Sequence, residues 1–191
     1  MDSTITGRHT GGDTLMATWN SRGLRGSTLE DLINKTNEKY AEKGLALIQK
    51  IPTPITPVKM DKEHRQITLA YFEQKSTVDY IGVVQGIPIC FDAKECAVDT
   101  FSLQNIHHHQ VEFMYRFEKQ GGIAFFLIYY SAKNVFCYLP YEMLRFFWDR
   151  AQEGGRKSFR YDELNPDYIL PKKNGVLVPY LEILKKDLED R

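Results

Sequence analysis

Residues 76–94, with the sequence STVDYIGVVQGIPICFDAK, constrain the fold of this chain more than any other stretch. β-branched and aromatic residues flank a Gln85-Gly86 pair, with alternation before the pair and a more apolar run after it. This pattern predicts a β-hairpin in which Gln85 and Gly86 are the two loop residues. We therefore expect two adjacent antiparallel strands here.

Pairing outward from the predicted loop places two carboxylates face to face. Asp79 stands opposite Asp92 and Thr77 stands opposite Lys94, with all four side chains on one face of the hairpin. Two carboxylates about 5 Å apart repel by about 3 kcal/mol at an effective dielectric of about 20, a cost that a hairpin has no structural reason to accept. A divalent cation between them removes this cost. Asp79 and Asp92 are therefore candidate ligands of Mg²⁺, with Mn²⁺ as its substitute.

The same positions suit the hydrolysis of a phosphodiester. Mg²⁺ takes hard oxygen ligands, keeps several waters and accepts phosphate oxygens as further ligands. A lysine beside the ion, here Lys94, can orient the attacking water or offset the developing negative charge. The arrangement T-x-D, hairpin, D-x-K resembles the PD-(D/E)xK nuclease superfamily, with Val78 in place of Pro.

A purely structural interpretation of this pattern stays open. Acidic pairs and D-x-K triplets are common, and Lys94 would then be a solvated lysine at the end of a strand. The predicted register favours the nuclease site as long as no bulge at Gly82 or Gly86 shifts the pairing.

Composition narrows the class of protein. The chain has 191 residues, 42% hydrophobic and 13% aromatic, which suits one domain with a sizeable core. Lys and Arg number 25, as do Asp and Glu, so binding to a polyanion requires clustered cations. The three cysteines lack C-x-x-C spacing, and the apolar run 123–130 is too short to span a bilayer. We expect a cytoplasmic, nucleoid-associated protein without a membrane partner.

The beginning of the chain has a different composition. Residues 1–20 are rich in Thr, Gly and Ser without any period, which predicts a disordered arm before a single domain over residues 21–191. Arg22 and Arg25 follow in a Gly-flanked loop and are candidate contacts to DNA phosphates, although two solvated arginines are an equally good interpretation.

A helix is predicted next. Ser27 and Glu30 have the spacing of a capping box, and an apolar face with a period of 3.6 residues follows. Glu30 thus has a structural explanation as the third residue of the box. The alternative is a catalytic role, in which Glu30 positions a metal ion or a water molecule.

A stiff projection interrupts the strand that follows this helix. Three alternating prolines in the sequence IPTPITPVKMDKEHRQ remove ladder donors, so residues 52–71 are expected to form an extended stalk that ends in the strand 67–72. Lys59, Lys62 and Arg65 lie near its tip. They are candidate DNA-binding residues, and the alternative is solvated charge on a protruding loop.

A second helix is predicted to pack on the hairpin. Leu103, Ile106, Gln110 and Phe113 share a helical face that ends before a Gly-Gly pair. The polar Gln110 within this apolar stripe needs a partner, so we expect its amide to point at the carboxylate pair or at a metal-bound water. Three histidines precede Gln110, but consecutive helical positions point in different directions, which argues against zinc.

The remaining elements complete an α/β pattern. The apolar run 123–131 predicts a strand buried on both faces, and residues 134–139 predict another. Pro140 opens a further helix. The Gly-hinged, basic loop 150–160 is a second candidate for phosphate contact, and residues 179–188 predict an amphipathic docking helix.

Several pieces taken together resemble the RecU family of Holliday-junction resolvases. They are SRG with TLEDLINKTN, KIPTP, AYFEQKSTVDYIG, FDAKE, FSLQNIHHHQ, FFWDR and GRKS, and they run from about Asn20 to the last helix. The resemblance implies a restriction-endonuclease-like core, with a mixed central sheet flanked by helices and a stalk that enters the centre of a four-way junction. It also implies a homodimer and Mg²⁺-dependent symmetric nicking, with recombinase or branch-migration proteins as further partners.

The resemblance also assigns roles to individual residues. Thr77, Asp79, Asp92 and Gln110 would be metal-linked, and Lys94 would stabilise the transition state. Asp92 stands where the family usually has Glu, one methylene longer.

The sequence predicts a structure-selective endonuclease that resolves Holliday junctions in recombination and repair. Two alternatives stay open. One is another PD-(D/E)xK endonuclease acting on linear duplex, and the other is a non-catalytic recombination partner that binds branched DNA.

Overall fold

The computed structural model describes residues 28–72, 77–172 and 175–191. The predicted arm over residues 1–20, the two candidate DNA contacts Arg22 and Arg25, and the predicted capping residue Ser27 all lie outside the described residues.

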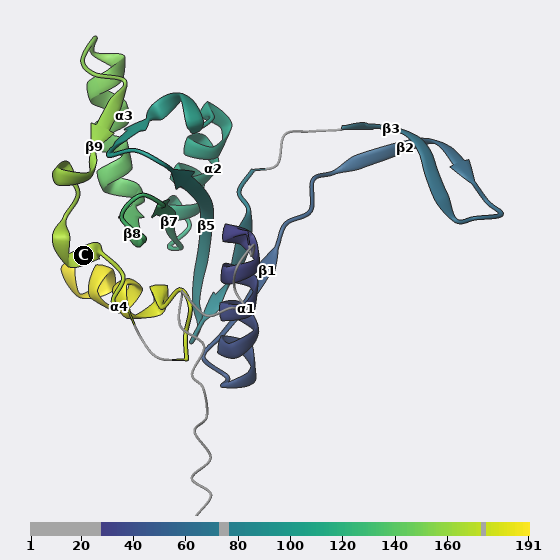
Figure 1. Cartoon of the computed structure of the whole chain (residues 1–191), viewed down its shortest axis with the longest axis horizontal. Coiled ribbons are helices and arrows are strands. Elements are labelled where there is room, and N and C mark those ends of the chain that lie inside the picture. Colours follow the sequence, from purple (N-terminus) through teal and green to yellow (C-terminus); the bar gives the residue numbers. More distant parts are fainter. Residues whose placement is uncertain (1–27, 73–76, 173–174) are drawn as a thin grey trace, which may run out of the picture.

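A mixed five-stranded sheet forms the centre of the molecule (Figure 1). Its strand order is β1-β4-β5-β7-β8; β5 and β7 run parallel, and the other three neighbouring pairs run antiparallel. This arrangement confirms the predicted α/β class with a mixed central sheet flanked by helices. The strands are β1 (Ala46–Lys50), β4 (Tyr80–Val84), β5 (Ile87–Cys96), β7 (Ile123–Tyr130) and β8 (Val135–Pro140).

The β4–β5 hairpin has the predicted register. The ladder runs from Tyr80 opposite Phe91 to Val84 opposite Ile87 without a shift, which leaves Gln85 and Gly86 as the loop. Both loop residues have positive φ, 47° and 88°, as a type I′ turn requires. The ladder ends at Tyr80, however, so the predicted pairing of Thr77 with Lys94 is not part of the sheet.

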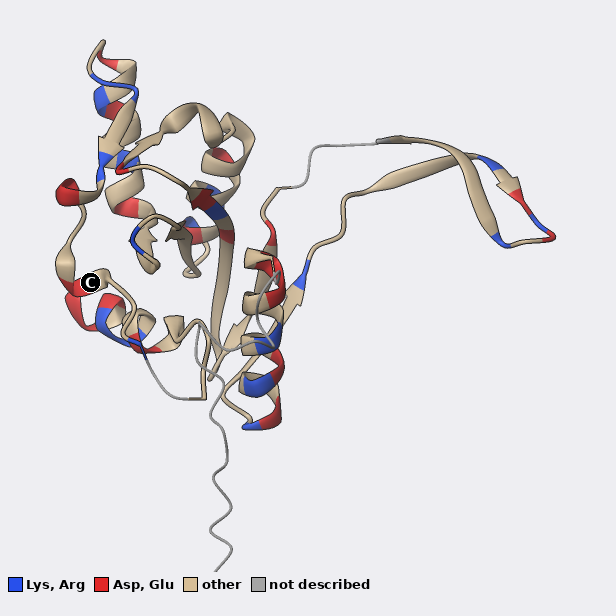
Figure 2. Ribbon diagram, in the orientation of Figure 1, with Lys and Arg blue, Asp and Glu red and all other residues tan. Residues whose placement is uncertain are grey.

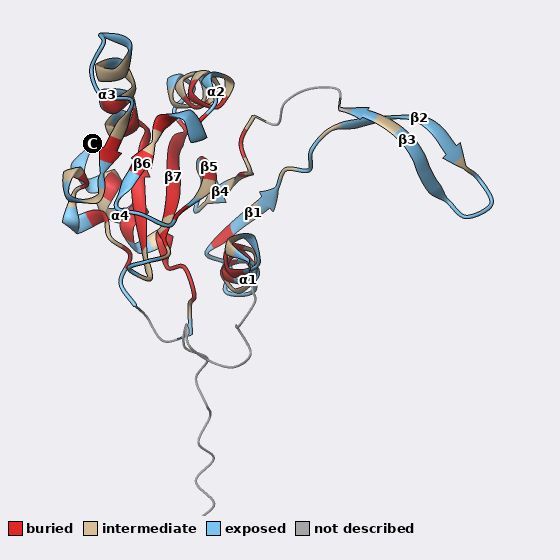
Figure 3. Ribbon diagram, turned by 45° about the horizontal axis from the view of Figure 1, so that its top comes forward, coloured by how far each residue is buried: buried red, intermediate tan, exposed pale blue. Residues whose placement is uncertain are grey.

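Four helices of the described residues cover the two faces of the sheet. Buried residues of α1 (Leu29–Glu42) and α4 (Tyr180–Asp190) share one core cluster with Phe91 and Phe125. Buried residues of α2 (His108–Lys119) and α3 (Tyr141–Gln152) share the other with Cys90 and Phe126. β7 is buried along almost its whole length, as its unbroken apolar run predicts (Figure 3). None of the helices in the described ranges is long and apolar enough to cross a bilayer.

The alternation of side chains along β5 determines which pair of helices Asp92 and Lys94 face. Phe91 belongs to the cluster under α1 and α4, whereas Cys90 belongs to the cluster under α2 and α3. Since side chains repeat every second residue, Asp92 and Lys94 face the α2 side, together with Cys90.

Helix α1 begins one residue later than predicted. Its N-cap is Thr28, whose Oγ1 accepts the N–H of Asp31, while the Asp31 carboxylate accepts the N–H of Thr28. The expected capping box of Ser27 and Glu30 was therefore wrong, because the segment STLED offers the same spacing in two overlapping frames. The Glu30 side chain therefore takes no part in the capping box.

Helix α2 begins five residues later than the predicted apolar stripe. Leu103–Asn105 form a short 3₁₀ helix (η2), and Ile106 is extended, with ψ 126°. Leu103 and Ile106 are buried in the same core cluster as α2, but they do not belong to that helix. A short sheet of β6 (Thr100–Ser102) and β9 (Ser158–Arg160), which the sequence did not predict, lies beside this segment.

The remaining short elements connect β9 to α4. They are the 3₁₀ helices η3 (Tyr161–Glu163) and η4 (Pro166–Tyr168).

A long hairpin projects from the body (Figure 1). It consists of β2 (Ile55–Asp61) and β3 (Gln66–Phe72), which pair only with each other. Pro57 lies inside β2, where a two-stranded ribbon with two free edges tolerates the missing donor. The pairing shifts around Lys59, so the ribbon carries a bulge near its middle. This hairpin occupies the range predicted for the stalk, although the sequence indicated a strand only for its second half.

Candidate active site

Asp79 and Asp92 meet at one end of the β4–β5 hairpin. They occupy the position directly beyond the last ladder pair, Tyr80 and Phe91. Asp92 is completely buried and Asp79 is half-buried. Oδ2 of Asp79 accepts the backbone N–H of Ala93 at 3.0 Å, which holds this carboxylate against the neighbouring strand. The predicted juxtaposition of the two carboxylates is therefore present in the structure.

Both oxygens of the Asp92 carboxylate accept hydrogen bonds. Lys94 Nζ donates to Oδ1 at 2.5 Å, and Gln110 Nε2 donates to Oδ2. The Lys94 side chain is 20% exposed, whereas the Asp92 side chain beside it is completely buried. Asp79, directly before β4, thus comes together with Asp92 and Lys94 from β5 and Gln110 from α2, as predicted.

The first turn of α2 fixes the orientation of the Gln110 amide. Gln110 is the third residue of the helix, and its Oε1 accepts the backbone N–H of the N-cap residue His107 at 3.0 Å. With the oxygen held in this way, the amide nitrogen points at Asp92. The assignment follows from the hydrogen-bond network, since the N–H of His107 can only donate. In this arrangement Gln110 positions the Asp92 carboxylate.

The pKa of Asp92 is raised to about 7. The main cause is burial, which disfavours the charged form, and the neighbouring Asp79 charge acts in the same direction. The Lys94 ammonium lowers the pKa and offsets only part of this effect. A bound cation therefore stabilises the charged form of this buried carboxylate more than it would stabilise that of a solvated one.

The donor set fits a hard divalent cation. Two carboxylates converge, and each Asp92 oxygen keeps a further lone pair besides the one that accepts a hydrogen bond. In the described parts of the chain no group of three His, Cys, Asp or Glu side chains is arranged to hold a metal. The ion would therefore need further oxygen ligands, from Thr77, from the backbone, from water or from a phosphate. Thr77 lies half-buried two residues before Asp79.

An ion pair that the sequence did not predict flanks the site. Glu30, in the first turn of α1, pairs with Lys50 at the end of β1, and both side chains are about half exposed. Lys50 is the strand partner of Tyr80, the residue next to Asp79. The only sequence signal for Lys50 was its place at the end of a strand, directly before the proline-rich projection.

Tyr80 packs under α1, in the same core cluster as Leu32 and Ile33. Its hydroxyl donates to Asn34 Oδ1 at 3.1 Å. Burial raises the pKa of Tyr80, and the charges of Glu30 and Asp79 raise it further. Glu30 on α1 and the acid pair on the α2 side therefore lie at the same end of the sheet but on opposite faces.

The candidate DNA-binding residues of the projection lie apart from this centre. Lys62 and Arg65 are in the turn at the tip of the β2–β3 hairpin, alongside Asp61 and Glu63, and Lys59 lies in β2 two residues before its end (Figure 2). Oδ1 of Asp61 accepts the backbone N–H of Glu63 at 3.0 Å, so one of these carboxylates shapes the turn. The tip is thus less cationic than its lysines and arginine alone suggest.

The basic loop 150–160 is partly neutralised. Arg150 donates to the Glu163 carboxylate at 2.7 Å and to the carbonyl of Ser158, and Arg156 donates to the same carboxylate. Arg150 therefore has a structural role here, whereas Lys157 remains exposed.

Comparison with known families identifies the chain. Residues 24–186 match the family model described as RecU, Recombination protein U. The chain belongs to the RecU family. Curated RecU relatives include proteins named Holliday junction resolvase RecU. The one from Pediococcus pentosaceus is 42% identical over 88% of this chain and 86% of its own length. The one from Bacillus subtilis is 44% identical over 85% of this chain and 80% of its own length.

Comparison with solved structures finds a weak similarity. Hjc, a Holliday junction resolvase from the archaeal hyperthermophile Archaeoglobus fulgidus, matches 60% of this RecU chain and 78% of its own with a TM-score of 0.38 and 9% identity.

Proposed function

We infer that this RecU protein is a Holliday junction resolvase, an endonuclease that cuts phosphodiester bonds at four-way DNA junctions. Its relatives, 40–48% identical, carry that name. The observation that carries the chemistry is the buried Asp92 carboxylate, which lies next to Asp79 and between Lys94 and Gln110.

Each residue of the site has a distinct task in this proposal. Asp79 and Asp92 hold a divalent cation, for which we propose Mg²⁺, with Thr77 completing its oxygen ligands. A bound Mg²⁺ supplies an activated water and neutralises phosphate charge. Lys94 faces the scissile phosphate and stabilises the charge that develops on it, and for this it leaves Asp92 when the cation takes its place.

Gln110 acts on Asp92 in this proposal. With its Oε1 committed to the His107 N–H, its Nε2 keeps the Asp92 carboxylate in one rotamer before and after a cation binds. Because that contact is anchored in the first turn of α2, the helix and the catalytic strand are held in register.

We propose that Glu30 and Lys50 guide the DNA strand towards this centre. Their ion pair is half exposed, so Lys50 can exchange its carboxylate partner for a phosphate at little cost. Glu30, freed from Lys50, can then orient a water at this end of the sheet.

The projecting hairpin and a two-fold dimer complete the proposal. A four-way junction has near two-fold symmetry, so a homodimer with two acid pairs can nick two strands symmetrically. The hairpin of each protomer would enter the open centre of the junction, with its cations on the phosphates that crowd there.

The test is a nicking assay on a synthetic four-way junction with and without Mg²⁺. Symmetric nicks in two opposite strands that require the metal support the resolvase. Equal cutting of the junction and of the corresponding linear duplex would favour a duplex endonuclease instead. Binding without cutting in both Mg²⁺ and Mn²⁺ would favour a non-catalytic partner in recombination.

A further inference from the structure

A shallow pocket of about 450 Å³ lies between the segment before α2 and the C-terminal half of α3. Its floor is apolar: Leu103 and Ile106 are buried, and the indole of Trp148 is half-buried. Trp148 also borders a second hollow between α2 and α3, so the indole is not enclosed by the core. An uncharged, flat group therefore fits the floor of this pocket better than a charged one.

The rim of the pocket is polar and cationic. It is formed by Gln104, Gln152 and Lys157, all of which are exposed. A carboxamide can both donate and accept a hydrogen bond, and an ammonium attracts an anion. The rim thus offers one positive charge and two groups suited to the edge of a heterocycle.

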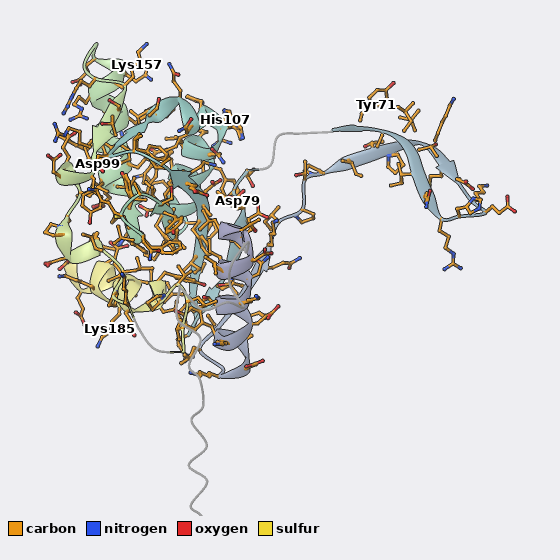
Figure 4. The ribbon with its side chains drawn as sticks, viewed as in Figure 1. Tyr71, Asp79, Asp99, His107, Lys157 and Lys185 are labelled. Carbon is orange, nitrogen blue, oxygen red and sulfur yellow. The ribbon has the colours of Figure 1, made fainter. Side chains whose placement is uncertain are left out.

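The pocket is joined to the acid pair through a short chain of contacts. Ile106 in its floor is followed by His107, whose N–H donates to Gln110, and Gln110 donates to Asp92. In Figure 4, His107 lies between Asp79 and Lys157. DNA with its scissile phosphate at the acid pair can therefore extend past the start of α2 towards the pocket.

We propose that this pocket holds one unstacked nucleobase of the DNA and thereby selects the nucleotide sequence at which the strand is nicked. The base stacks on the indole of Trp148, Gln104 and Gln152 contact its edge, and Lys157 contacts the adjoining phosphate. The proposal rests on the proposed function, because it takes junction DNA as the ligand. A branch point supplies bases that have already lost a stacking partner, which lowers the cost of placing one in a pocket.

The fluorescence of Trp148 reports directly on such stacking. The chain has two tryptophans, Trp19 and Trp148, so Trp19→Phe leaves the pocket indole as the sole tryptophan, which is excited selectively at a wavelength that tyrosine does not absorb. Asp92→Asn added to this variant prevents cutting while DNA is titrated. Saturating four-way junction should quench the emission by about a third or more, since the base lies flat on the indole. Unchanged emission at a DNA concentration that saturates binding would overturn the proposal.

Paired substitutions test the energetic and the selective role. Trp148→Leu should weaken junction binding roughly 5- to 100-fold, the loss that accompanies removal of one stacking platform. Phe146→Leu is the control, because Phe146 is exposed on the same helix and does not border this pocket. An equal loss in both variants would overturn the stacking role, and thermal unfolding of both identifies any general destabilisation.

Selectivity is read from the positions of the nicks. On junctions whose branch point migrates through varied sequence, Gln104→Ala and Gln152→Ala should redistribute the nicks among the available sequences. Gln120→Ala, an exposed glutamine at the far end of α2, should leave the pattern unchanged. Unaltered patterns in cutting-competent variants overturn the base pocket alone, whereas failure of the unmodified protein to cut junctions overturns the proposed function as well.

Discussion

Asp92 has no solvent exposure, and yet the one full positive charge that touches it in the described parts of the chain belongs to the partly exposed Lys94. The sequence predicted this carboxylate and its neighbour Asp79 from hairpin register alone, because a two-residue loop fixes every pair of an unbulged ladder. It also predicted that Lys94 and the Gln110 amide lie near this pair, but not that Asp92 is completely buried. That burial depends on how α2 packs on the sheet, which is a tertiary feature and has no local sequence signal.

The stability of the metal-free protein should depend on pH through Asp92. Its pKa is about 7 in the folded chain and about 4 when unfolded, so the folded state holds an extra proton between these values. The contribution of Asp92 to stability is therefore fully present below about pH 4 and is lost as pH rises towards 7. Asp92→Asn removes this loss and should gain about 2 kcal/mol more over wild type at pH 8 than at pH 5. Urea unfolding in a chelator measures this.

The same substitution should abolish nicking while junction binding persists. An advantage of Asp92→Asn that is equal at both pH values would show that Asp92 is charged throughout this range.

Lys94→Ala should lower the nicking rate by a factor on the order of 10² to 10³, as removal of one transition-state donor does. Junction affinity should hardly change, because the ammonium lies inside the site and pairs with Asp92 in the absence of DNA. Single-turnover cutting and equilibrium binding separate the two effects. A loss confined to binding would make Lys94 a residue that positions the DNA backbone.

Among the elements, the sequence predicted best those whose pattern is local. β7 and the β4–β5 hairpin follow from an apolar run and a turn, and α3 follows from Pro140. The pairing of β6 with β9 joins short segments that are far apart in the sequence, so no local sequence pattern predicts it. The capping of α1 by Thr28 needed a choice between two frames that only the packing of Leu32 and Ile33 decides.

The approach of β1 to β4 depends on Gly82. A Cβ at this position would lie 2.2 Å from the Leu47 carbonyl oxygen and 2.7 Å from the Ile48 Cα, and backbone cannot yield as a side chain does. Gly82→Ala should therefore displace β1, with a loss of about 1–3 kcal/mol in unfolding free energy. Because β1 carries Lys50, nicking should fall as well. Val83→Ala, at a partly exposed position on the same strand, is the control. Equal stability of the two variants would contradict the close approach.

At the scale of the whole molecule, the body and the projecting hairpin carry different parts of the proposed function. The body carries the acid pair, and the hairpin carries exposed cations at a distance from it (Figures 1 and 2). With 25 basic and 25 acidic residues, overall charge gives no attraction to DNA, so affinity has to come from such local clusters. The sequence indicated the projection through its prolines, but not that it pairs with itself as a ribbon.

Neutralising the tip should therefore change how junction binding responds to salt. Each cation that contacts a duplex phosphate releases a counterion, so replacing Lys59, Lys62 and Arg65 by Gln should reduce the log-log salt slope by up to about 3. Junction affinity should fall more than linear-duplex affinity, because only the branched DNA surrounds the tip. Nicking at low salt should persist, since the acid pair is untouched. Replacing Lys185 and Lys186 on α4 by Gln is the control and should leave the slope unchanged. Binding curves for both substrates across a salt series test this prediction. An equal loss of affinity for junction and linear DNA would contradict the entry of the hairpin into the junction centre, but not the assignment of the nuclease site.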